Sequence, residues 1–469
     1  MAGDPTVGEI PEHWELTTLG EICKRGGGNI QTGPFGSQLH ASDYVPVGVP
    51  SIMPVNIGEN RLIEKGIARI TEADADRLGK HRVTAGDIIY SRRGDVERRA
   101  LVRDAQEGWF CSTGCLKVRL GNGVIDPEFA SHYLGHPSVR QWIVRHAVGA
   151  TMPNLNTAIM EAIPFALPPL SEQKAIAQIL GAMDDKIELD RRMNATLEAM
   201  ARALFQSWFV DFDPVRAKLD GRKPAGLDAA TAGLFPAKFQ ESSLGPIPQR
   251  WNIGVLNDLT DLVIGGDWGS SAPSDEENVP TLCIRGADVP SLQEGGIGKM
   301  PTRFLKTSSL EKRRLLSGDL AVEISGGSPT QSTGRPVLVS SGLIERLEYP
   351  LVCSNFCRVL KLKSSTMSKF VYLWIRRIYD NGEFLQFENG TTGIKNLAFT
   401  VFAEKYRLVI PPPALGAAFD RAVSPLFERH QANGIQSRTL ATLRDTLLPR
   451  LLSGELRVSE VERGIGRAV

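Results

Sequence analysis

The chain has 469 residues, of which 42% are hydrophobic and 23% charged, so it is too long for one ordinary core and predicts about three globular domains. Its formal net charge of +1, from 54 basic and 53 acidic residues, excludes a global positive field, so DNA binding would have to come from local patches. The six cysteines are too few for a disulfide scaffold, and the sequence has neither a membrane-spanning apolar run nor a secretory leader, which predicts a cytoplasmic protein with no membrane partner.

The N-terminal segment shares its pattern with a segment in the second half of the chain. Residues 10–22 read IPEHWELTTLGEI, and residues 247–259 read IPQRWNIGVLNDL. In both, a proline and the tryptophan that follows it lead into an apolar turn. We predict that Trp14 and Trp251 are core side chains rather than ligand platforms.

The two copies then differ, in residues 26–84 of the first and 263–316 of the second. Different sequences in the same place of a repeated scaffold are what a variable recognition surface would require. The first region contains TGPFGSQLHASDY, in which Gly36, Ser37 and Gln38 are candidate DNA-binding residues.

An arginine-rich segment follows. Residues 85–102, AGDIIYSRRGDVERRALV, predict a strand, a tight polar turn and a second strand, and residues 317–339 match them in position. From Tyr90 to Arg103, both included, there are five arginines against two acids. Because a guanidinium suits both phosphates and guanine edges, we predict DNA contacts here, with a solvated hairpin as the alternative. The candidates are Arg92, Arg93, Arg98 and Arg99.

Both copies end in a glycine-rich turn with Thr and Asn, GATMPNLN in the first and GTTGIKNL in the second. These side chains could contact phosphate, while turn and capping hydrogen bonds are the alternative. In the second copy a neutral Ser/Thr/Gln loop, flanked by glycines that permit close backbone approach, takes the place of the arginine-rich turn. The candidates from these segments are Thr151, Asn154, Gln331, Arg335, Lys395 and Asn396.

A long helix is predicted at residues 171–209, after Pro168 and Pro169, with Ser171 as its N-cap. Its 39 residues would extend about 58 Å. Steps of four and three residues define an apolar seam of the coiled-coil type, interrupted by Asp190 and Asn194. The seam residues are Ile176, Leu180, Met183, Ile187, Leu197, Leu204 and Trp208.

A second copy of this helix lies 243 residues later. The offset carries the proline pair onto Pro411 and Pro412 and much of the seam onto apolar residues, with a polar middle in both copies. We predict that the two helices pack together and are antiparallel. Pro449 should interrupt the second helix, and Gly434 should loosen it. The second seam comprises Phe419, Val423, Leu426, Leu440 and Leu447.

Two CxxxC pairs recur, Cys111 with Cys115 and Cys353 with Cys357. They could bind zinc, but both lie in apolar, strand-like runs without histidine at ligand spacing, which favours core cysteines. The chain lacks GxxxxGK[ST], GxGxxG, HExxH and GxSxG, and it lacks the Asn-Pro-Pro-aromatic or Asp-Pro-Pro-aromatic motif of amino-methyltransferases. No catalytic or metal-binding residue is therefore predicted.

The sequence resembles the specificity subunits (HsdS) of type I restriction-modification systems. The matching stretches are IPEHWELTTLGEI, TGPFGSQLHASDY, AGDIIYSRRGDV and IPFALPPLSEQKAIAQILGAMDDKIE. The last is the most specific, because PPL-x-EQ at the start of a long amphipathic helix is that family's most recognisable feature. The second copy departs from it, since Leu415 and Gly416 stand where the first copy has Glu172 and Gln173.

The resemblance implies an α+β fold, with two α/β target-recognition domains related by a pseudo-two-fold axis and separated by a pair of long antiparallel helices. It implies target-recognition domains at residues 1–167 and 247–410, helices at 168–212 and 411–456, a linker at 213–246 and a tail at 457–469.

The function implied is that of a non-catalytic host-defence subunit, which reads a bipartite, asymmetric site in double-stranded DNA. Two modification subunits and the restriction subunits are the expected partners. S-adenosylmethionine, ATP and Mg²⁺ are expected on those partners only. The alternative is a coiled-coil adaptor whose two domains bind proteins. A nuclease is a further alternative that no motif supports.

Overall fold

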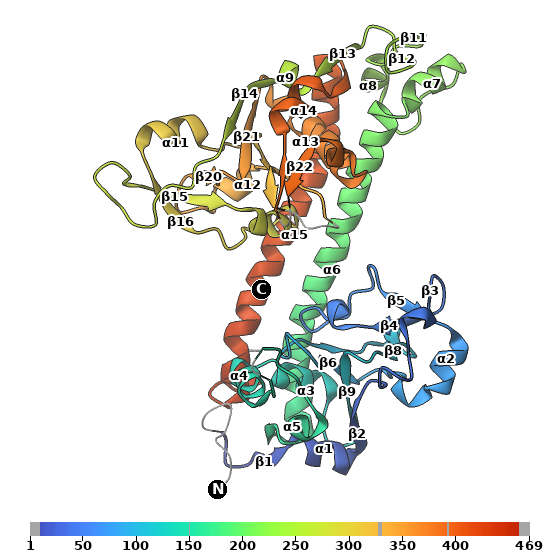
Figure 1. Cartoon of the computed structure of the whole chain (residues 1–469), viewed down its shortest axis with the longest axis vertical. Helices are drawn as coiled ribbons and strands as arrows, with labels where there is room; N and C mark the ends of the chain where they lie inside the picture. Colours follow the sequence, from blue (N-terminus) through green and yellow to red (C-terminus); the bar gives the residue numbers. More distant parts are fainter. Residues whose placement is uncertain (1–9, 150, 327–330, 392–393, 459–469) are drawn as a thin grey trace. The chain divides into compact units, whose positions relative to one another are not determined.

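The computed structural model describes residues 10–149, 151–326, 331–391 and 394–458. The chain forms two compact units, unit 1 with Met1–Lys186 and Leu440–Val469 and unit 2 with Ile187–Thr439 (Figure 1). The long helices α6 (Leu170–Phe209) and α15 (Pro413–Leu452) each belong partly to one unit and partly to the other. Each unit therefore combines a domain of mixed helices and strands with one part of each long helix.

The main sheet of unit 1 has four strands in the order β2-β9-β6-β7, and all neighbours are antiparallel. Ile88 and Tyr90 enter one apolar cluster and Ile89 another, because alternate residues of a strand point to opposite faces. Strands β6 and β7 confirm the predicted hairpin in the first copy. The strands are β2 (Gly27–Thr32), β9 (Cys115–Gly121), β6 (Ile88–Ser91) and β7 (Arg99–Leu101).

A second sheet of unit 1 has the order β3-β5-β4-β8, in which β4 and β8 are parallel. A separate pair joins β1 near the start of the unit to β10 just before α6. These strands are β3 (Tyr44–Val45), β5 (Ala68–Ile70), β4 (Val49–Ile52), β8 (Phe110–Cys111), β1 (Glu15–Thr18) and β10 (Pro164–Leu167).

Several short helices of unit 1 begin at side-chain caps. Thr18 accepts a hydrogen bond from the Glu21 backbone, and Asp126 accepts one from Phe129 with Pro127 as the first helical residue. The helices are α1 (Leu19–Gly26), α2 (Glu72–Arg77), α3 (Pro127–Leu134), α4 (Pro137–His146) and α5 (Thr157–Glu161), and the 3₁₀ turns are η1 (Ala41–Asp43), η2 (Pro54–Asn56), η3 (Gly79–His81) and η4 (Asp104–Gln106).

Both long helices complete the core of unit 1. Leu180 near the start of α6 and Leu451 near the end of α15 belong to the same apolar cluster as the main sheet. An ion pair of 2.5 Å joins Arg444 of α15 to Asp184 of α6. The first part of α6 thus packs with the last part of α15, so the two helices run in opposite directions here. Trp14 is 6% exposed in this core, which confirms its prediction.

The main sheet of unit 2 has the order β14-β21-β17-β19, again with antiparallel neighbours. A smaller sheet has the order β16-β15-β20, in which β15 and β20 are parallel. The strands are β14 (Thr260–Gly265), β21 (Cys357–Leu362), β17 (Leu320–Glu323), β19 (Pro336–Leu338), β16 (Thr302–Leu305), β15 (Val279–Ile284) and β20 (Leu351–Cys353).

Further strand pairs in unit 2 are β13 with β24, β11 with β12, and the three-stranded sheet β18-β23-β22. These strands are β13 (Asn252–Val255), β24 (Arg407–Ile410), β11 (Phe239–Gln240), β12 (Ile247–Pro248), β18 (Ser325–Gly326), β23 (Ile394–Leu397) and β22 (Glu388–Thr391). The helices of the domain are α9 (Leu256–Leu259), α10 (Val289–Gln293), α11 (Thr307–Arg313), α12 (Ser341–Ile344), α13 (Ser368–Asp380) and α14 (Phe399–Lys405), with 3₁₀ turns η5 (Gly286–Asp288), η6 (Ser365–Met367) and η7 (Glu383–Phe387).

The two units share one main-sheet topology. Strands β2, β9, β6 and β7 of unit 1 correspond in sheet order to β14, β21, β17 and β19 of unit 2. The β17–β19 pair confirms the hairpin predicted for residues 317–339. Helices α3 and α13 each follow the second strand of this order, and β10 and β24 each precede a long helix. The internal repeat seen in the sequence is therefore a repeat of structure.

Aromatic side chains dominate the core of unit 2. Phe209 of α6 meets Phe419 of α15 and Phe370 of α13, each with ring centroids 4.9 Å apart. Trp251 is 2% exposed among them, which confirms the second tryptophan prediction. The last part of α6 here packs with the first part of α15, again in opposite directions.

The predicted seam is buried or half-buried throughout. Seven of its residues are at most 7% exposed, namely Ile176, Leu180, Met183, Ile187, Trp208, Phe419 and Val423. The other five, Leu197, Leu204, Leu426, Leu440 and Leu447, are intermediate. In unit 2 the polar middle is also buried, and Asn433 donates a hydrogen bond of 2.9 Å to the Asn194 side chain, whose amide donates to the His430 carbonyl.

Two predictions about the helices are wrong in detail. Helix α6 begins at Leu170, so Ser171 lies in its first turn and is not the N-cap. Helix α15 continues through Pro449 to Leu452, because Leu451 and Leu452 are buried in the core of unit 1 and this packing offsets the hydrogen bond that proline removes. Helix α15 is continuous through Gly434, and the looseness expected there stays a prediction.

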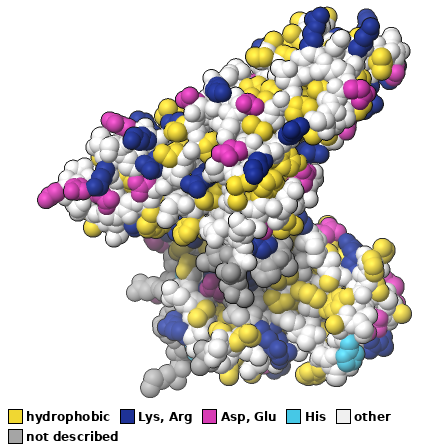
Figure 2. Space-filling view, turned by 45° about the horizontal axis from the view of Figure 1, so that its top comes forward, with side chains coloured by type: hydrophobic (Ala, Val, Ile, Leu, Met, Phe, Trp, Pro, Cys, Tyr) yellow, Lys and Arg dark blue, Asp and Glu magenta, His cyan; other side chains and the backbone are white. Residues whose placement is uncertain are grey.

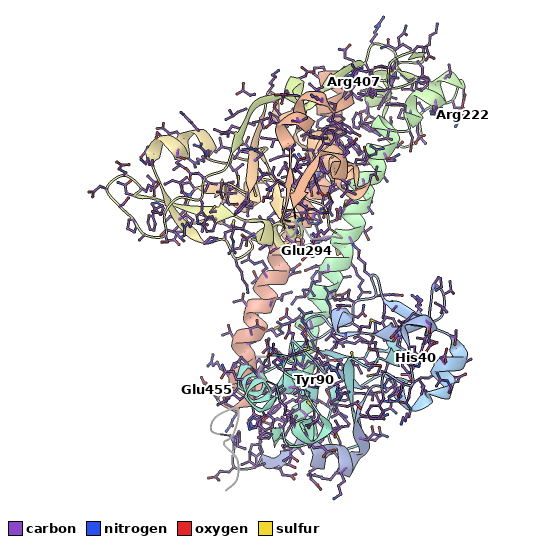
Figure 3. The ribbon with its side chains drawn as sticks, viewed as in Figure 1. His40, Tyr90, Arg222, Glu294, Arg407 and Glu455 are labelled. Atoms are coloured by element: carbon purple, nitrogen blue, oxygen red, sulfur yellow. The ribbon has the colours of Figure 1, made fainter. Side chains whose placement is uncertain are left out.

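Gly434 also allows a loop to touch the helix. A β-carbon at this position would lie 2.7 Å from the carbonyl oxygen of Glu294, so only glycine lets the backbone approach this closely. Glu294, beside α15, is labelled in Figure 3.

The segment at 213–246, predicted as a linker, has structure of its own. It contains α7 (Asp213–Leu219) and α8 (Ala229–Gly233). Val215 and Phe235 are buried in the aromatic core of unit 2.

Candidate nucleic-acid interface

The candidate residues of unit 1 gather at one end of its main sheet. Strand β2 ends at Thr32 opposite Leu116, and β6 ends at Ser91 opposite Cys115. Since neighbouring strands are antiparallel, the loop after β2 and the β6–β7 turn leave the sheet at the same end. The first contains Gly36, Ser37 and Gln38, and the second contains the arginines.

Backbone hydrogen bonds attach the arginine-rich turn to the GATMPNLN segment. Gly94 donates to the Pro153 carbonyl at 3.0 Å, and Leu155 donates to the Arg92 carbonyl at 2.9 Å. Arg93 and Asn154 also form an antiparallel bridge. The structure thus joins the turn of Arg92 and Arg93 to Asn154, in the segment that also contains Thr151.

The four candidate arginines have different surroundings. Arg93 is exposed, and its side chain has no ion-pair or hydrogen-bond partner within the described ranges. Arg98 pairs with Asp95 at 2.6 Å. Arg99 points inward, where it donates to the Ser131 carbonyl at 2.7 Å, and burial lowers the pKa of its guanidinium. Arg99 therefore does not join the other arginines at the surface.

The acids of the turn are already paired. Asp95 is bound by Arg98, and Glu97 is bound by Arg140 at 2.8 Å. Arg92 is half-buried, and its Nε has no hydrogen-bond partner among the residues that the structure describes. The turn consequently presents Arg92 and Arg93 as its available cations. Since the net charge of the chain is only +1, a positive surface for DNA has to be local, as this one is. Figure 2 shows basic side chains interspersed with acidic ones on the face in view.

The loop after β2 also presents an aromatic side chain that the sequence pattern did not single out. Phe35 is 67% exposed, and its backbone amide donates to the Gln38 side chain, which in turn closes the Gly36–Ser37 turn. An exposed phenylalanine on an ordered turn suits base stacking or contact with a thymine methyl group. Nothing in the alternation of polar and apolar residues distinguishes Phe35 from a core residue.

Unit 2 has the same arrangement at the corresponding end of its main sheet. The β18 residues Ser325 and Gly326 pair with Asn396 and Lys395 of β23, so the loop after β17 meets the GTTGIKNL segment. Gln331 and Asn396 are exposed there. Residues 327–330 and Thr392 lie outside the described residues.

The basic candidates of unit 2 are engaged with acids. Arg335 forms two hydrogen bonds of 2.7 Å with Glu323, whose side chain is 3% exposed. Lys395 lies 3.3 Å from Glu388. Burial opposes ionisation of Glu388, but hydrogen bonds from Ser332 and Thr333 hold the pKa of this carboxyl below its ordinary value. Arg335 therefore stabilises the sheet end, while Asn396 and Gln331 face solvent.

Unit 2 also exposes a phenylalanine at this end, in a different loop. Phe356 is 55% exposed in the turn between β20 and β21. In unit 2 the loop after the first strand holds Trp268 instead, and the Arg303 guanidinium covers that ring at 4.4 Å. The sheet ends thus share a scaffold and differ in the side chains they offer.

The recurrent cysteines are core residues, as predicted, and they lie at the ends of strands. All six cysteines are buried and free, and burial raises the pKa of Cys115 to about 12. Among the described residues, no group of three or more His, Cys, Asp or Glu side chains is placed to hold a metal ion. In the same ranges, no helix combines the length and the apolar character needed to span a bilayer.

Comparison with known proteins agrees with this arrangement. Residues 11–199 match the family model of the type I restriction modification DNA specificity domain. The chain is similar to type I restriction specificity subunits. It is 24% identical over 451 residues to the type I restriction enzyme HindI specificity subunit of Haemophilus influenzae, covering 87% of this chain and 95% of the relative.

A second relative covers the chain almost completely. The MjaIX specificity subunit of Methanocaldococcus jannaschii is 23% identical over 461 residues, covering 97% of this chain and 96% of the relative. Among solved structures, the crystal structure of a type I restriction-modification S subunit from M. genitalium has the same fold, with a TM-score of 0.50, 16% identity and coverage of 96% and 99%.

The family resemblance in the sequence is thereby confirmed. Residues 11–199 therefore match a DNA specificity domain. These comparisons do not favour the protein-binding adaptor.

Proposed function

We propose that this specificity subunit reads an asymmetric, bipartite DNA sequence, one half with each unit. One observation carries the proposal. Both units join the same two loops at the same end of the same four-stranded sheet, yet Arg92 and Arg93 stand in one and Lys395 and Asn396 in the other. A shared scaffold with different side chains suits two half-sites of different sequence.

In this proposal the long helices set the distance between the two half-sites. Contacts within each unit support antiparallel packing of α6 and α15, and an antiparallel coiled coil would relate two similar domains by an approximate two-fold axis. Duplex DNA presents its two strands with the same kind of symmetry. A rigid helix pair would then set the number of base pairs between the half-sites.

The proposal includes the remaining assignments. Residues 1–167 and 247–410 act as target-recognition domains, 168–212 and 411–456 as the helices, 213–246 as the connection and 457–469 as the tail. The subunit would recruit modification subunits, two by the symmetry of the helices, and restriction subunits. S-adenosylmethionine, ATP and Mg²⁺ would be bound by those partners and not by this chain.

Methylome sequencing tests the proposal. A host expressing this chain with its modification subunit should acquire methylated adenine in a two-part motif, and a host with the modification subunit alone should not. Methylation without a bipartite motif, or the same motif in the host lacking this chain, would overturn it. Exchanging residues 26–84 for those of a relative should change one half-motif and leave the spacer unchanged.

A further inference from the structure

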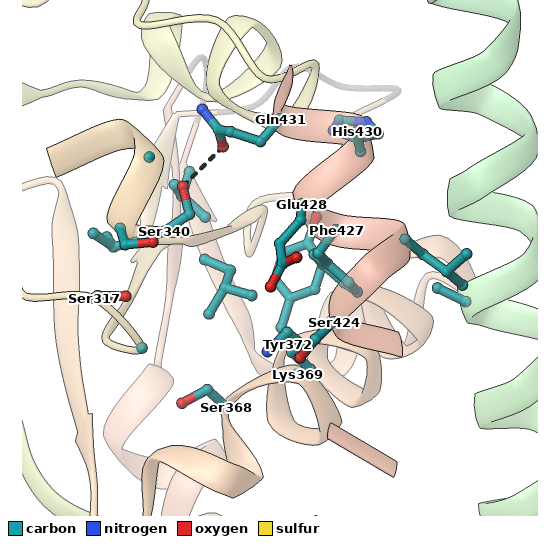
Figure 4. Close-up of a pocket in the computed structure, with 18 of the residues that line it drawn as sticks. Ser317, Ser340, Ser368, Lys369, Tyr372, Ser424, Phe427, Glu428, His430 and Gln431 are labelled. Atoms are coloured by element: carbon teal, nitrogen blue, oxygen red, sulfur yellow. Dashed lines mark hydrogen bonds between the residues drawn. The ribbon is translucent and has the colours of Figure 1, made fainter. Parts of the chain in front are cut away.

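Unit 2 contains a cavity of about 570 Å³ between the two long helices and its domain. Helix α6 contributes Ala201 and α15 contributes Phe427, while α13 contributes Lys369 and Leu373. In Figure 4, α15 and α13 line one side of the cavity, and the chain around Ser340 lines the other. Ser340 donates a hydrogen bond of 2.8 Å to the Gln431 side chain. The cavity is large enough for a long side chain and part of its backbone.

In unit 1 a charged side chain occupies the matching place. Arg444 is 12% exposed and forms ion pairs of 2.5 Å with Asp184 and 3.1 Å with Glu59. Burial works against its charge, but Asp184 and Asp445 together more than compensate and raise the pKa of the guanidinium above its ordinary value. His132 of α3 lies 3.8 Å from Asp184 and 3.6 Å from Glu128.

The internal repeat relates these residues to the walls of the cavity. The helix offset of 243 residues places Ala201 where the other helix has Arg444, and Phe427 where α6 has Asp184. Helices α3 and α13 begin 241 residues apart, at Pro127 and Ser368. That offset pairs Glu128 and His132 with Lys369 and Leu373, so all four counterparts line the cavity. The place that the Arg444 guanidinium fills in unit 1 therefore has no guanidinium in the described part of unit 2.

The cavity walls show which occupant would be stable there. The Tyr372 and Phe427 rings, with centroids 5.8 Å apart, offer apolar surface and aromatic faces. Glu345 and Glu428 are exposed lining residues, and neither has an ion-pair partner within the described parts of the chain. Lys369 adds no net charge, because Asp420 binds it at 2.7 Å. A side chain with an apolar stem and a cationic end suits both the aromatic surface and the two unpaired glutamates.

Two buried polar atoms in the wall also point to a bound peptide. Ser368 is 3% exposed, and its hydroxyl has no hydrogen-bond partner among the described residues. The side-chain nitrogen of Gln431 is buried and likewise unpartnered within those ranges. Buried polar groups are normally satisfied, so each should gain a partner on binding. A cationic donor would satisfy the Ser368 oxygen, and a backbone carbonyl would accept from Gln431.

We propose that this cavity receives a lysine or arginine side chain of the modification subunit, in the place that Arg444 fills in unit 1. The inference rests on the proposed function, which supplies that partner. Docking on unit 2 then depends on a cationic side chain of the partner, whereas unit 1 carries its own cation, Arg444.

Filling the cavity tests its role in docking. Ala201→Arg supplies the guanidinium from within the chain, and Ala199→Arg adds the same side chain at an exposed position of α6 outside the cavity. Isothermal titration of the full-length chain with its modification subunit should show binding weakened roughly thirtyfold by A201R, the loss typical of a hot-spot side chain, and unchanged by A199R. Equal affinities of A201R and A199R would overturn the proposal.

Removing charge without changing volume tests the cationic assignment. Glu345→Gln with Glu428→Gln should weaken binding about three- to tenfold and reduce its salt dependence. Glu311→Gln with Glu404→Gln removes two exposed acids of unit 2 outside the cavity and should change neither quantity. Because Glu345 and Glu428 are exposed, these variants keep the test valid even if A201R fails to fold.

The remaining outcomes separate the two proposals. If A201R weakens binding and the charge-removing pair does not, an apolar side chain fills the cavity and the cationic assignment is wrong. If the unmodified chain does not bind the modification subunit at all, the proposed function fails before the cavity is at issue.

Discussion

Units 1 and 2 share a main-sheet topology and differ at the sheet end where the candidate residues gather. In unit 1 the acids of the β6–β7 turn are paired with Arg98 and Arg140, so Arg92 and Arg93 are available. In unit 2 the corresponding Arg335 is held by a buried glutamate, and Gln331 and Asn396 face solvent. Because these loops lie outside the core, their chemistry can change while the sheet is retained.

The units also differ in how their cores join the long helices. Unit 2 stacks aromatic rings from α6, α13 and α15, whereas unit 1 uses aliphatic residues together with the Arg444–Asp184 ion pair. Phe419 of α15 stands 243 residues after Ile176 of α6, and both are buried. The same helix position therefore carries more buried surface in unit 2.

The largest effect on stability is expected from a change in the aromatic core of unit 2. Phe419→Ala should lower the free energy of unfolding by about 3–5 kcal/mol, because the ring is fully buried among other rings. Ile176→Ala removes fewer atoms and should cost less. Urea titration followed by tryptophan fluorescence measures both, with Leu189→Ala, at a position 47% exposed, as the control. A smaller loss for F419A than for I176A would contradict the comparison.

Arg335→Ala should destabilise unit 2 by about 3–5 kcal/mol, because it leaves the Glu323 carboxylate buried without its partner. Arg93→Ala at the corresponding end of unit 1 should change stability by no more than about 0.5 kcal/mol, since the side chain is exposed. Thermal unfolding of both variants measures the difference. Unchanged stability of R335A, combined with an altered half-motif, would make Arg335 a DNA reader instead.

Acid should destabilise unit 1 through His81. Its side chain is 3% exposed, and burial, with Lys80 and Lys117 nearby, lowers the pKa of His81 from 6.5 to about 4. The folded state therefore binds fewer protons, and stability falls as the pH decreases from 6.5 towards 4, by about 2 kcal/mol near pH 5.

The variant His81→Asn should flatten this dependence in urea titrations across the same pH range. Exposed His40 of the same unit, labelled in Figure 3, provides the matched control as His40→Asn. Parallel pH profiles for H81N and the unmodified chain would show that another group is responsible.

Arg92→Ala combined with Arg93→Ala should weaken DNA binding about tenfold and lower the slope of log affinity against log salt by up to about 2. Arg98→Ala, which removes an arginine already paired with Asp95, should have a smaller effect. Fluorescence anisotropy at several salt concentrations measures both. A loss confined to one half-motif would indicate base contact, a uniform loss phosphate contact, and no loss would remove this turn from the interface.

The smallest effects are expected from the exposed phenylalanines. Phe35→Ala should change base preference in one half-motif and Phe356→Ala in the other, each by about 1 kcal/mol of discrimination. Methylome sequencing of hosts carrying each variant reports the two halves separately. Changes in the same half-motif for both variants would contradict the assignment of one half-site to each unit.

Patterns that repeat along the chain were predicted from sequence with few errors. The seam at steps of four and three residues predicted a 39-residue helix, and α6 has 40 residues. The 243-residue offset predicted α15, and the matching Gly-Asp segments predicted both hairpins. These features depend on local periodicity, which the chain displays directly.

The role of the most specific motif became visible only in the fold. Glu172 accepts a hydrogen bond from the Trp14 indole, and Gln173, 1% exposed, joins the Asp126 backbone to the Pro168 carbonyl. The Glu-Gln pair therefore ties the start of α6 to the domain of unit 1. In unit 2 Gly416 occupies this place, and a β-carbon there would lie 2.2 Å from the sulfur of Met367.

The sequence by itself thus determined the family resemblance, the two long helices and the repeat, because periodicity and spacing are properties of the chain. Only the tertiary structure decided that Arg93 faces solvent while Arg99 and Arg335 turn inward, since each side chain's direction depends on acids and carbonyls distant in sequence. It also decided that α15 continues through Pro449, because packing of the following leucines offsets the lost hydrogen bond.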